Sequence, residues 1–111
     1  MKTNESAPAP AAASLLFPVP GDLLSTNAVE LRSQLDAFLA AHEERKSVWE
    51  ALELDLRRAS MVDSVGLNFL VALHKRLHAE GKKLRIRTVS DSVQRILRFT
   101  RLDQYAEVVP S

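Results

Sequence analysis

Apolar and polar residues follow two different periods along this chain. Alternation with a period of two predicts half-buried strands at residues 48–56, where three leucines oppose Glu53 and Asp55, and at residues 83–89, where aliphatic side chains oppose two arginines. A short apolar run at residues 15–20 contains two prolines. Because proline cannot donate to a strand ladder, we expect this run to form an edge strand.

Three further segments have apolar residues at the spacing of an amphipathic helix. The first follows the break at residues 21–22 and covers about 15 residues before a charge-rich stretch. The second begins near Asp63 and ends at Gly81, and the third is capped by Ser90 or Asp91. Strands and helices therefore alternate along the chain.

This alternation predicts a single α/β domain with a mixed β-sheet, or a parallel one, and short right-handed crossovers. Because the strands are apolar on one side only, we expect the helices to pack mainly on one face of the sheet. Residues 105–109 are expected to add an edge strand. The domain is predicted at residues 15–111. Residues 1–14, rich in alanine and proline, are predicted to form a disordered tail.

Composition narrows the class of protein further. The chain of 111 residues has the length of one domain, and it contains no cysteine, which excludes disulfides, thiol catalysis and thiolate metal sites. The net charge is only +1, so the chain lacks the excess of positive charge that is typical of a nucleic-acid binder. No apolar run approaches the ~18 residues of a membrane span. A signal peptide is the rival interpretation of the N-terminal segment, but Pro18 stops its apolar run and Glu5 precedes it. We expect a cytoplasmic protein that binds neither nucleic acid nor membrane and is a monomer when free.

The sequence gives only weak evidence for a catalytic or metal-binding site. The three glycines are far apart, so no phosphate-binding loop can be built from them. His74 and His78 have a helical spacing that can hold a metal, but no third ligand accompanies them, and a partly buried helix face explains them better. Solvation of a strand face explains Asp55, and helix capping explains Asp63. We therefore expect no metal, no cofactor and no enzymatic activity.

A row of basic residues marks the last predicted helix. Arg95, Arg98 and Arg101 recur every three residues. A solvated helix face explains them simply, and a binding surface for an acidic protein patch is the sharper interpretation. Nucleic acid ranks third, because aromatic residues are not interleaved with the arginines.

Residues 63–67 (DSVGL) lie where a loop meets the first turn of the second predicted helix. A hydroxyl of Ser64 at this point would be exposed, and the free N–H groups and dipole of a helix N-terminus favour an added phosphate. Phosphorylation would add about −1.5 to −2 charges to the surface. Alternatively, Asp63 or Ser64 serves only as the N-cap of the helix. The residues alone leave both interpretations open.

Residues 15–110 resemble the STAS domain, and in particular the stand-alone anti-sigma factor antagonists of bacterial partner-switching systems. Residues 63–67 are the most specific part, because DSVGL is similar to the D-S-[ST]-G-L loop that opens the family's second helix. Residues 21–23 (GDL) are similar to its G-[ED]-L turn after the first strand, and residues 93–97 match its V-x-R-x-L spacing. The resemblance implies a single STAS-like α/β domain.

The resemblance also implies a phosphorylation switch that acts in signal transduction and transcription regulation. Ser64 would be phosphorylated by a kinase-type anti-sigma factor with a histidine-kinase-like ATPase fold, and a PP2C-type phosphatase would remove the phosphate. The unphosphorylated form would bind the kinase and release its sigma factor or other client. Asp63 would lie at the kinase contact, Gly66 would permit the tight loop, and Asp22 would belong to the same partner-binding set. Val65, also in this set, stands where the family commonly has Ser or Thr.

Two other functions remain open at this point. One is a constitutive STAS subunit of a larger complex, such as a lipid-transport ABC assembly, in which Ser64 would be only a helix cap. The other is a small nucleotide-handling domain, for which the chain offers neither a phosphate loop nor a catalytic base. The presence of phosphate on Ser64 in cells separates the switch from the constitutive subunit.

Overall fold

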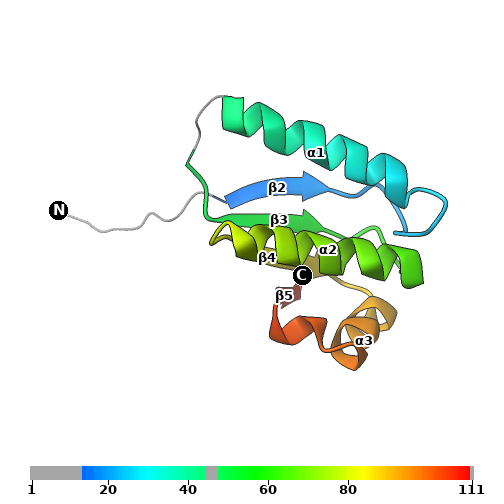
Figure 1. The fold of residues 1–111 in the computed structure, drawn as a ribbon. Coiled ribbons are helices and arrows are strands. Elements are labelled where there is room, and N and C mark those ends of the chain that lie inside the picture. Colours follow the sequence, from blue (N-terminus) through cyan, green and yellow to red (C-terminus); the bar gives the residue numbers. More distant parts are fainter. Residues whose placement is uncertain (1–13, 45–47, 111) are drawn as a thin grey trace.

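The computed structural model describes residues 14–44 and 48–110, which form one layer of strands and one layer of helices (Figure 1). The predicted tail at residues 1–14 lies outside the described residues, except for Ser14, which opens the first described strand. The elements in chain order are β2 (Ser14–Pro18), α1 (Ala28–Glu44), β3 (Ala51–Asp55), α2 (Ser64–Ala79), β4 (Lys83–Thr88), α3 (Asp91–Phe99), the short 3-10 helix η1 (Leu102–Gln104) and β5 (Glu107–Pro110).

The strands form one four-stranded sheet in the order β2-β3-β4-β5. The predicted α/β class is confirmed, and so is the C-terminal edge strand. All three pairs of described strands are parallel, so the sheet of the described residues is parallel rather than mixed. The reason is that a helical segment follows each of β2, β3 and β4 and returns the chain to the same end of the sheet before the next strand begins.

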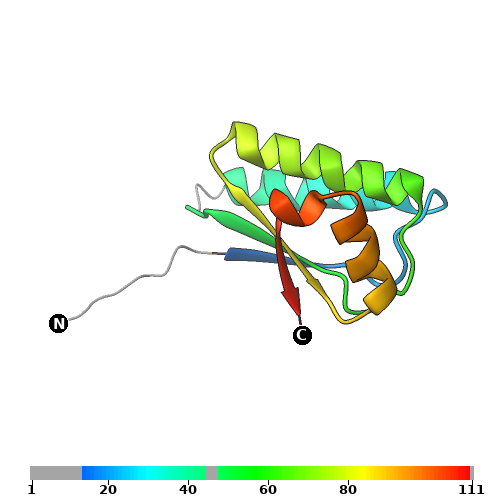
Figure 2. The ribbon, with the colours of Figure 1, turned by 90° about the horizontal axis from the view of Figure 1, so that it is seen from below.

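The helices cover one face of this sheet, as the alternation of the strands predicts. Figure 2 shows α1 and α2 side by side above the strands. Under them lie aliphatic side chains of the central strands, such as Leu54 and Ile86, both with no exposed area. Val93 and Leu97 of α3 join the same core, again with no exposed area. None of the described helices is long and apolar enough to cross a membrane.

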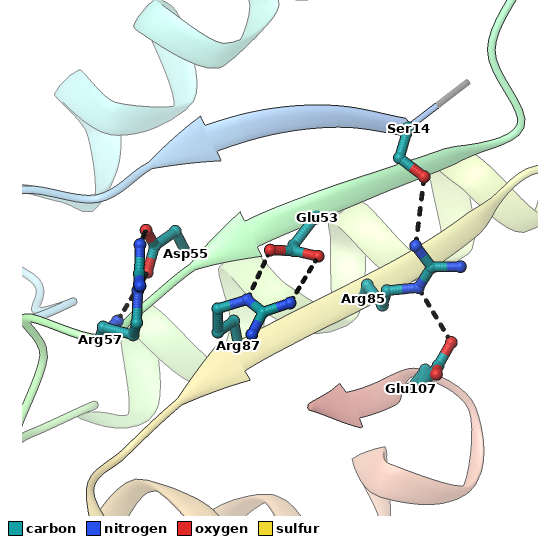
Figure 3. Close-up of polar contacts among 7 residues, drawn as sticks. All are labelled: Ser14, Glu53, Asp55, Arg57, Arg85, Arg87 and Glu107. Atoms are coloured by element: carbon teal, nitrogen blue, oxygen red, sulfur yellow. Dashed lines mark hydrogen bonds and ion pairs between the residues drawn. The ribbon is translucent and has the colours of Figure 1, made fainter. Parts of the chain in front are cut away.

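The opposite face of the sheet is a ladder of ion pairs (Figure 3). Arg87 on β4 donates to Glu53 on β3 at 2.7 Å, and Arg85 donates to the carboxylate of Glu107 on β5 at 3.0 Å. The expectation that Asp55 is solvated here is wrong. This carboxyl is paired with Arg57 at 2.8 Å, and the residue is only 9% exposed. The hydrogen bonds from Arg57 hold the pKa of Asp55 below its ordinary value, although partial burial opposes them.

Candidate functional site

The candidate site lies where two loops follow the carboxyl ends of neighbouring parallel strands, the edge at which open α/β sheets usually bind ligands. One loop covers residues 19–27 after β2, and the other covers residues 56–63 after β3. The buried Leu23 joins them. Its N–H donates to the Met61 carbonyl at 3.1 Å, and its carbonyl accepts from the Asp63 N–H at 3.2 Å. Figure 1 shows both strand ends and the start of α2 on the same side of the molecule.

Asp22 ties the first loop to the second through its carboxylate. Its Oδ1 accepts from the backbone N–H groups of Ser60 at 2.8 Å and Met61 at 3.2 Å. Its backbone carbonyl accepts from the Asn27 side-chain amide at 2.7 Å, while the Asn27 Oδ1 accepts from the Leu24 N–H at 2.9 Å. Asp22 therefore braces the loops. Its contact with a partner remains a prediction.

Asp63 is the N-cap of α2, as one of the two open interpretations expected. One carboxylate oxygen accepts from the Gly66 N–H at 2.8 Å, and the other accepts from the Ser25 N–H of the neighbouring loop at 2.7 Å. These backbone hydrogen bonds lower the pKa of Asp63, the bond from Gly66 contributing most. The carboxylate is therefore charged at neutral pH and is already engaged on both oxygens.

Ser64 is the first residue of α2 and is exposed. Among the described residues its hydroxyl has no hydrogen-bond partner. The capping role that one interpretation gave to Ser64 is therefore wrong for this hydroxyl, because Asp63 occupies that role. The result is a free hydroxyl at a rigid helix start, held in place by the residue before it.

Gly66 is needed because α2 begins directly against the first loop. A Cβ at this position would lie 2.2 Å from the carbonyl oxygen of Leu23 and 2.9 Å from its carbon. Both are backbone atoms of a residue held on each side by hydrogen bonds, so no side-chain rotation can relieve the clash. The glycine thus allows the close approach that brings Ser64 beside the loop after β2.

A groove of about 370 Å³ runs between α1 and α2 and begins next to Ser64. Val65 lies at this end and is 41% exposed, and Val29 on α1 is 80% exposed. Arg76 of α2 and Asp36 of α1, paired at 2.6 Å, line the groove from opposite helices. Sequence reasoning missed this groove, because its walls are two segments that only the fold brings together.

The two histidines of α2 are also beside each other in space. The rings of His74 and His78 lie 5.8 Å apart, and the Tyr105 ring lies 5.4 Å from that of His74. Burial lowers the pKa of His74, and the neighbouring His78 adds to this effect. Among the described residues there is no group of three His, Cys, Asp or Glu side chains that could hold a metal ion.

Comparison with known protein families matches residues 2–111 to the STAS domain. The chain belongs to the STAS domain family. The crystal structure of a sulfate transporter family protein from Wolinella succinogenes is similar, with a TM-score of 0.67 at 21% identity, over 86% of this chain and 75% of that one. The NMR structure of the protein TM1081 has a TM-score of 0.67 at 16% identity, over 100% of this chain and 91% of the other. At such identities these likenesses show the shared fold.

In this STAS domain the five residues predicted to bind a partner divide into two groups. Asp22, Asp63 and Gly66 hold the loops and the helix start in place through backbone contacts. Ser64 and Val65 project from that support and are exposed. Any partner that docks at the start of α2 therefore meets the hydroxyl and the valine, on a backbone the other three make rigid.

Proposed function

We propose that this STAS domain is an anti-sigma factor antagonist, a protein-binding module gated by phosphorylation of Ser64. The unphosphorylated form binds a kinase-type anti-sigma factor with a histidine-kinase-like ATPase fold and releases the sigma factor or other client. The kinase then phosphorylates Ser64, and a PP2C-type phosphatase restores the free hydroxyl. The module performs no chemistry of its own and acts in the cytoplasm, where its partners work.

One observation carries the proposal: the Ser64 hydroxyl is exposed and without a partner among the described residues, while Asp63 caps the helix. A phosphate could therefore be added without removing a hydrogen bond that the fold needs. A serine that served as the N-cap would have the hydroxyl of its capping hydrogen bond changed by modification. Phosphorylation can thus change the surface of the domain and leave its fold intact.

The electrostatics explain how the phosphate would release a partner. Asp63 already accepts the Gly66 N–H, so this N–H is not free to neutralise a phosphate on the adjacent Ser64. The lowered pKa of Asp63 keeps that carboxylate ionised beside the new dianion. Burying such a group in an interface without pairing charge is costly. A loss of ~3 kcal/mol weakens binding more than a hundredfold, which is enough to exchange partners.

The groove between α1 and α2 supplies the apolar part of the contact. It begins at Val65, the residue after the phosphoacceptor, and it continues past the exposed Val29. An apolar side chain of the kinase seated in it would place the polypeptide around it over Ser64. Binding and gating would then use adjoining parts of one surface.

A constitutive subunit of a larger complex, such as a lipid-transport ABC assembly, is the alternative. The similar Wolinella chain carries the name of the sulfate transporter family, so STAS folds of this shape occur in proteins named for transport. In that case Ser64 would remain unmodified, and the same partners would bind whatever residue stands at this position.

The deciding experiment uses the full chain as bait in native cell extract, in four forms: wild type, Ser64→Ala, Ser64→Asp and Ser33→Asp. The last is a matched control that places the same charge on an exposed serine of α1. We expect a histidine-kinase-like ATPase with wild type, Ser64→Ala and Ser33→Asp, and its loss with Ser64→Asp. Retention of the same proteins by Ser64→Asp would refute the gating and support a constitutive subunit.

A further inference from the structure

The outer face of α3 differs from the rest of the surface in combining an exposed aromatic ring with several cations. We call Arg95, Arg98, Phe99 and Arg101 the α3 surface. Phe99 is 88% exposed, the highest value among the large hydrophobic residues of the described chain. Arg95 and Arg98 lie on the same side of the helix, one turn apart, and both are exposed.

The apolar side of α3 is already used by the core. Val93 and Leu97 have no exposed area and pack among the buried residues of the sheet. Phe99 points away from that side and contributes nothing to the core. Figure 1 shows α3 beside the β4–β5 side of the sheet, separate from α1, so its outer face is not covered by another described element. The exposed phenylalanine therefore has no evident role in folding.

The three arginines of this surface have no ion-pair partners among the described residues. The nearest acidic residues in the sequence, Asp91 and Asp103, are not within ion-pair distance of them. On the uncovered sheet face, by contrast, each arginine of the ladder meets a carboxylate. The α3 surface thus presents positive charge that the fold itself does not compensate.

Arg101 occupies a backbone position that favours another residue type. It follows the last turn of α3 and has a φ of 63°, in the left-handed region. Among the described residues, no other non-glycine residue has a positive φ. Glycine is preferred at this position after a helix because it has no Cβ to clash. An arginine here places a third cation next to Arg98 despite the local strain.

The chemistry of these groups favours an acidic protein segment as the ligand. Arginine pairs with carboxylates through two parallel hydrogen bonds, and arginine and aromatic residues dominate the energetic centres of protein interfaces. A membrane fits less well, because membrane-surface helices insert a whole apolar face and α3 has only Phe99 to offer. Nucleic acid fits less well too, because the net charge is only +1 and no aromatic platform interleaves the arginines.

We propose that the α3 surface binds an acidic segment of a partner protein, with carboxylates on the arginines and an apolar contact on Phe99. This surface is separate from Ser64 in the sequence and on a different helix, and its role does not depend on phosphorylation. It would hold a partner in both states of the Ser64 switch.

The test replaces Phe99 with the photo-crosslinker p-benzoylphenylalanine in the full chain, in the cells that express it, and sequences the crosslinked partner peptide. The same crosslinker at Val48, which is 83% exposed, is the matched control for position. We expect a crosslink to a segment rich in Asp and Glu. The charge reversal Arg95→Glu with Arg98→Glu should lower its yield at least ~10-fold, whereas Lys75→Glu on α2 should not.

Three results would overturn the proposal: no crosslink above the Val48 control, a crosslink to lipid, or a partner segment without acidic residues. The milder pair Arg95→Gln and Arg98→Gln repeats the test without introducing new charge, and the unfolding temperature of each variant confirms that it folds. Repeating the crosslink with Ser64→Asp separates the two proposals. In the Ser64→Asp variant we expect the kinase to be lost, which supports the Ser64 switch. We expect the α3 crosslink to persist, which supports binding by the α3 surface in both states of the switch.

Discussion

Replacing Gly66 with alanine tests the packing that positions the candidate switch. The added Cβ would lie 2.2 Å from the Leu23 carbonyl oxygen, far inside the ~3.5 Å at which non-bonded heavy atoms attract each other best. Leu23 has no exposed area and is hydrogen-bonded through both its N–H and its carbonyl. The first turn of α2 must therefore move by roughly 1 Å, which also strains the 2.8 Å hydrogen bond from the Gly66 N–H to Asp63.

The expected change in the free energy of unfolding is the balance of destabilising and stabilising contributions. Overpacking of a rigid site costs ~1–3 kcal/mol, and the weakened cap adds to it. Alanine has a better helix propensity than glycine, which stabilises the variant by at most ~1 kcal/mol. We expect a net loss of ~2 kcal/mol, equivalent to a fall of ~10 °C in Tm for a domain of this size.

Thermal and guanidinium unfolding of the purified chain measure this loss, with Gly21→Ala as the matched control. A Cβ added at Gly21 would have no heavy atom within 4 Å, and the φ of this residue lies outside the left-handed region. We expect its alanine variant to stay within ~2 °C of wild type. If both alanine variants unfolded at the same temperature, α2 would not be held against Leu23 in the way that we describe.

Two further predictions concern the carboxylates and the free hydroxyl. In thermal unfolding, Ser64→Ala should leave Tm within ~1 °C of wild type. Asp63→Ala removes the helix cap and should lower Tm by ~5 °C. Equal effects of the two variants would contradict the assignment of the cap to Asp63 and of a free hydroxyl to Ser64. Because the hydrogen bonds from Arg57 lower the pKa of Asp55, its ionised form stabilises the fold above the ordinary value of 3.8, and this contribution is lost as the pH falls through the lowered pKa. The urea midpoint should therefore fall between about pH 5 and pH 3, and less steeply in Asp55→Asn; an unchanged slope in this variant would refute the assignment.

The order and type of the elements could be predicted because hydrophobic periodicity is a local property. The alternation around Glu53 placed β3, and the two capping candidates, Asp63 and Ser64, placed the start of α2. The choice between a mixed and a parallel sheet was open, because strand direction depends on which end of the sheet the chain returns to. Asp55 was misjudged because its partner, Arg57, lies in the loop and turns back onto the strand.

The DSVGL motif, its place at a helix start and the resemblance to the STAS family can all be predicted from neighbouring residues, without the fold. Which side chain caps the helix and which stays free depends also on contacts between distant segments. Asp22 reaches backbone groups 38 and 39 positions away, and Asp63 accepts from Ser25, 38 positions away. These contacts form only when the loops after β2 and β3 lie together. The Ser25 N–H takes up one oxygen of Asp63, while the other accepts the Gly66 N–H three residues along the chain. Both oxygens of Asp63 are then engaged, and the Ser64 hydroxyl is left exposed, because hydrogen-bond partners depend on proximity in space as well as along the chain.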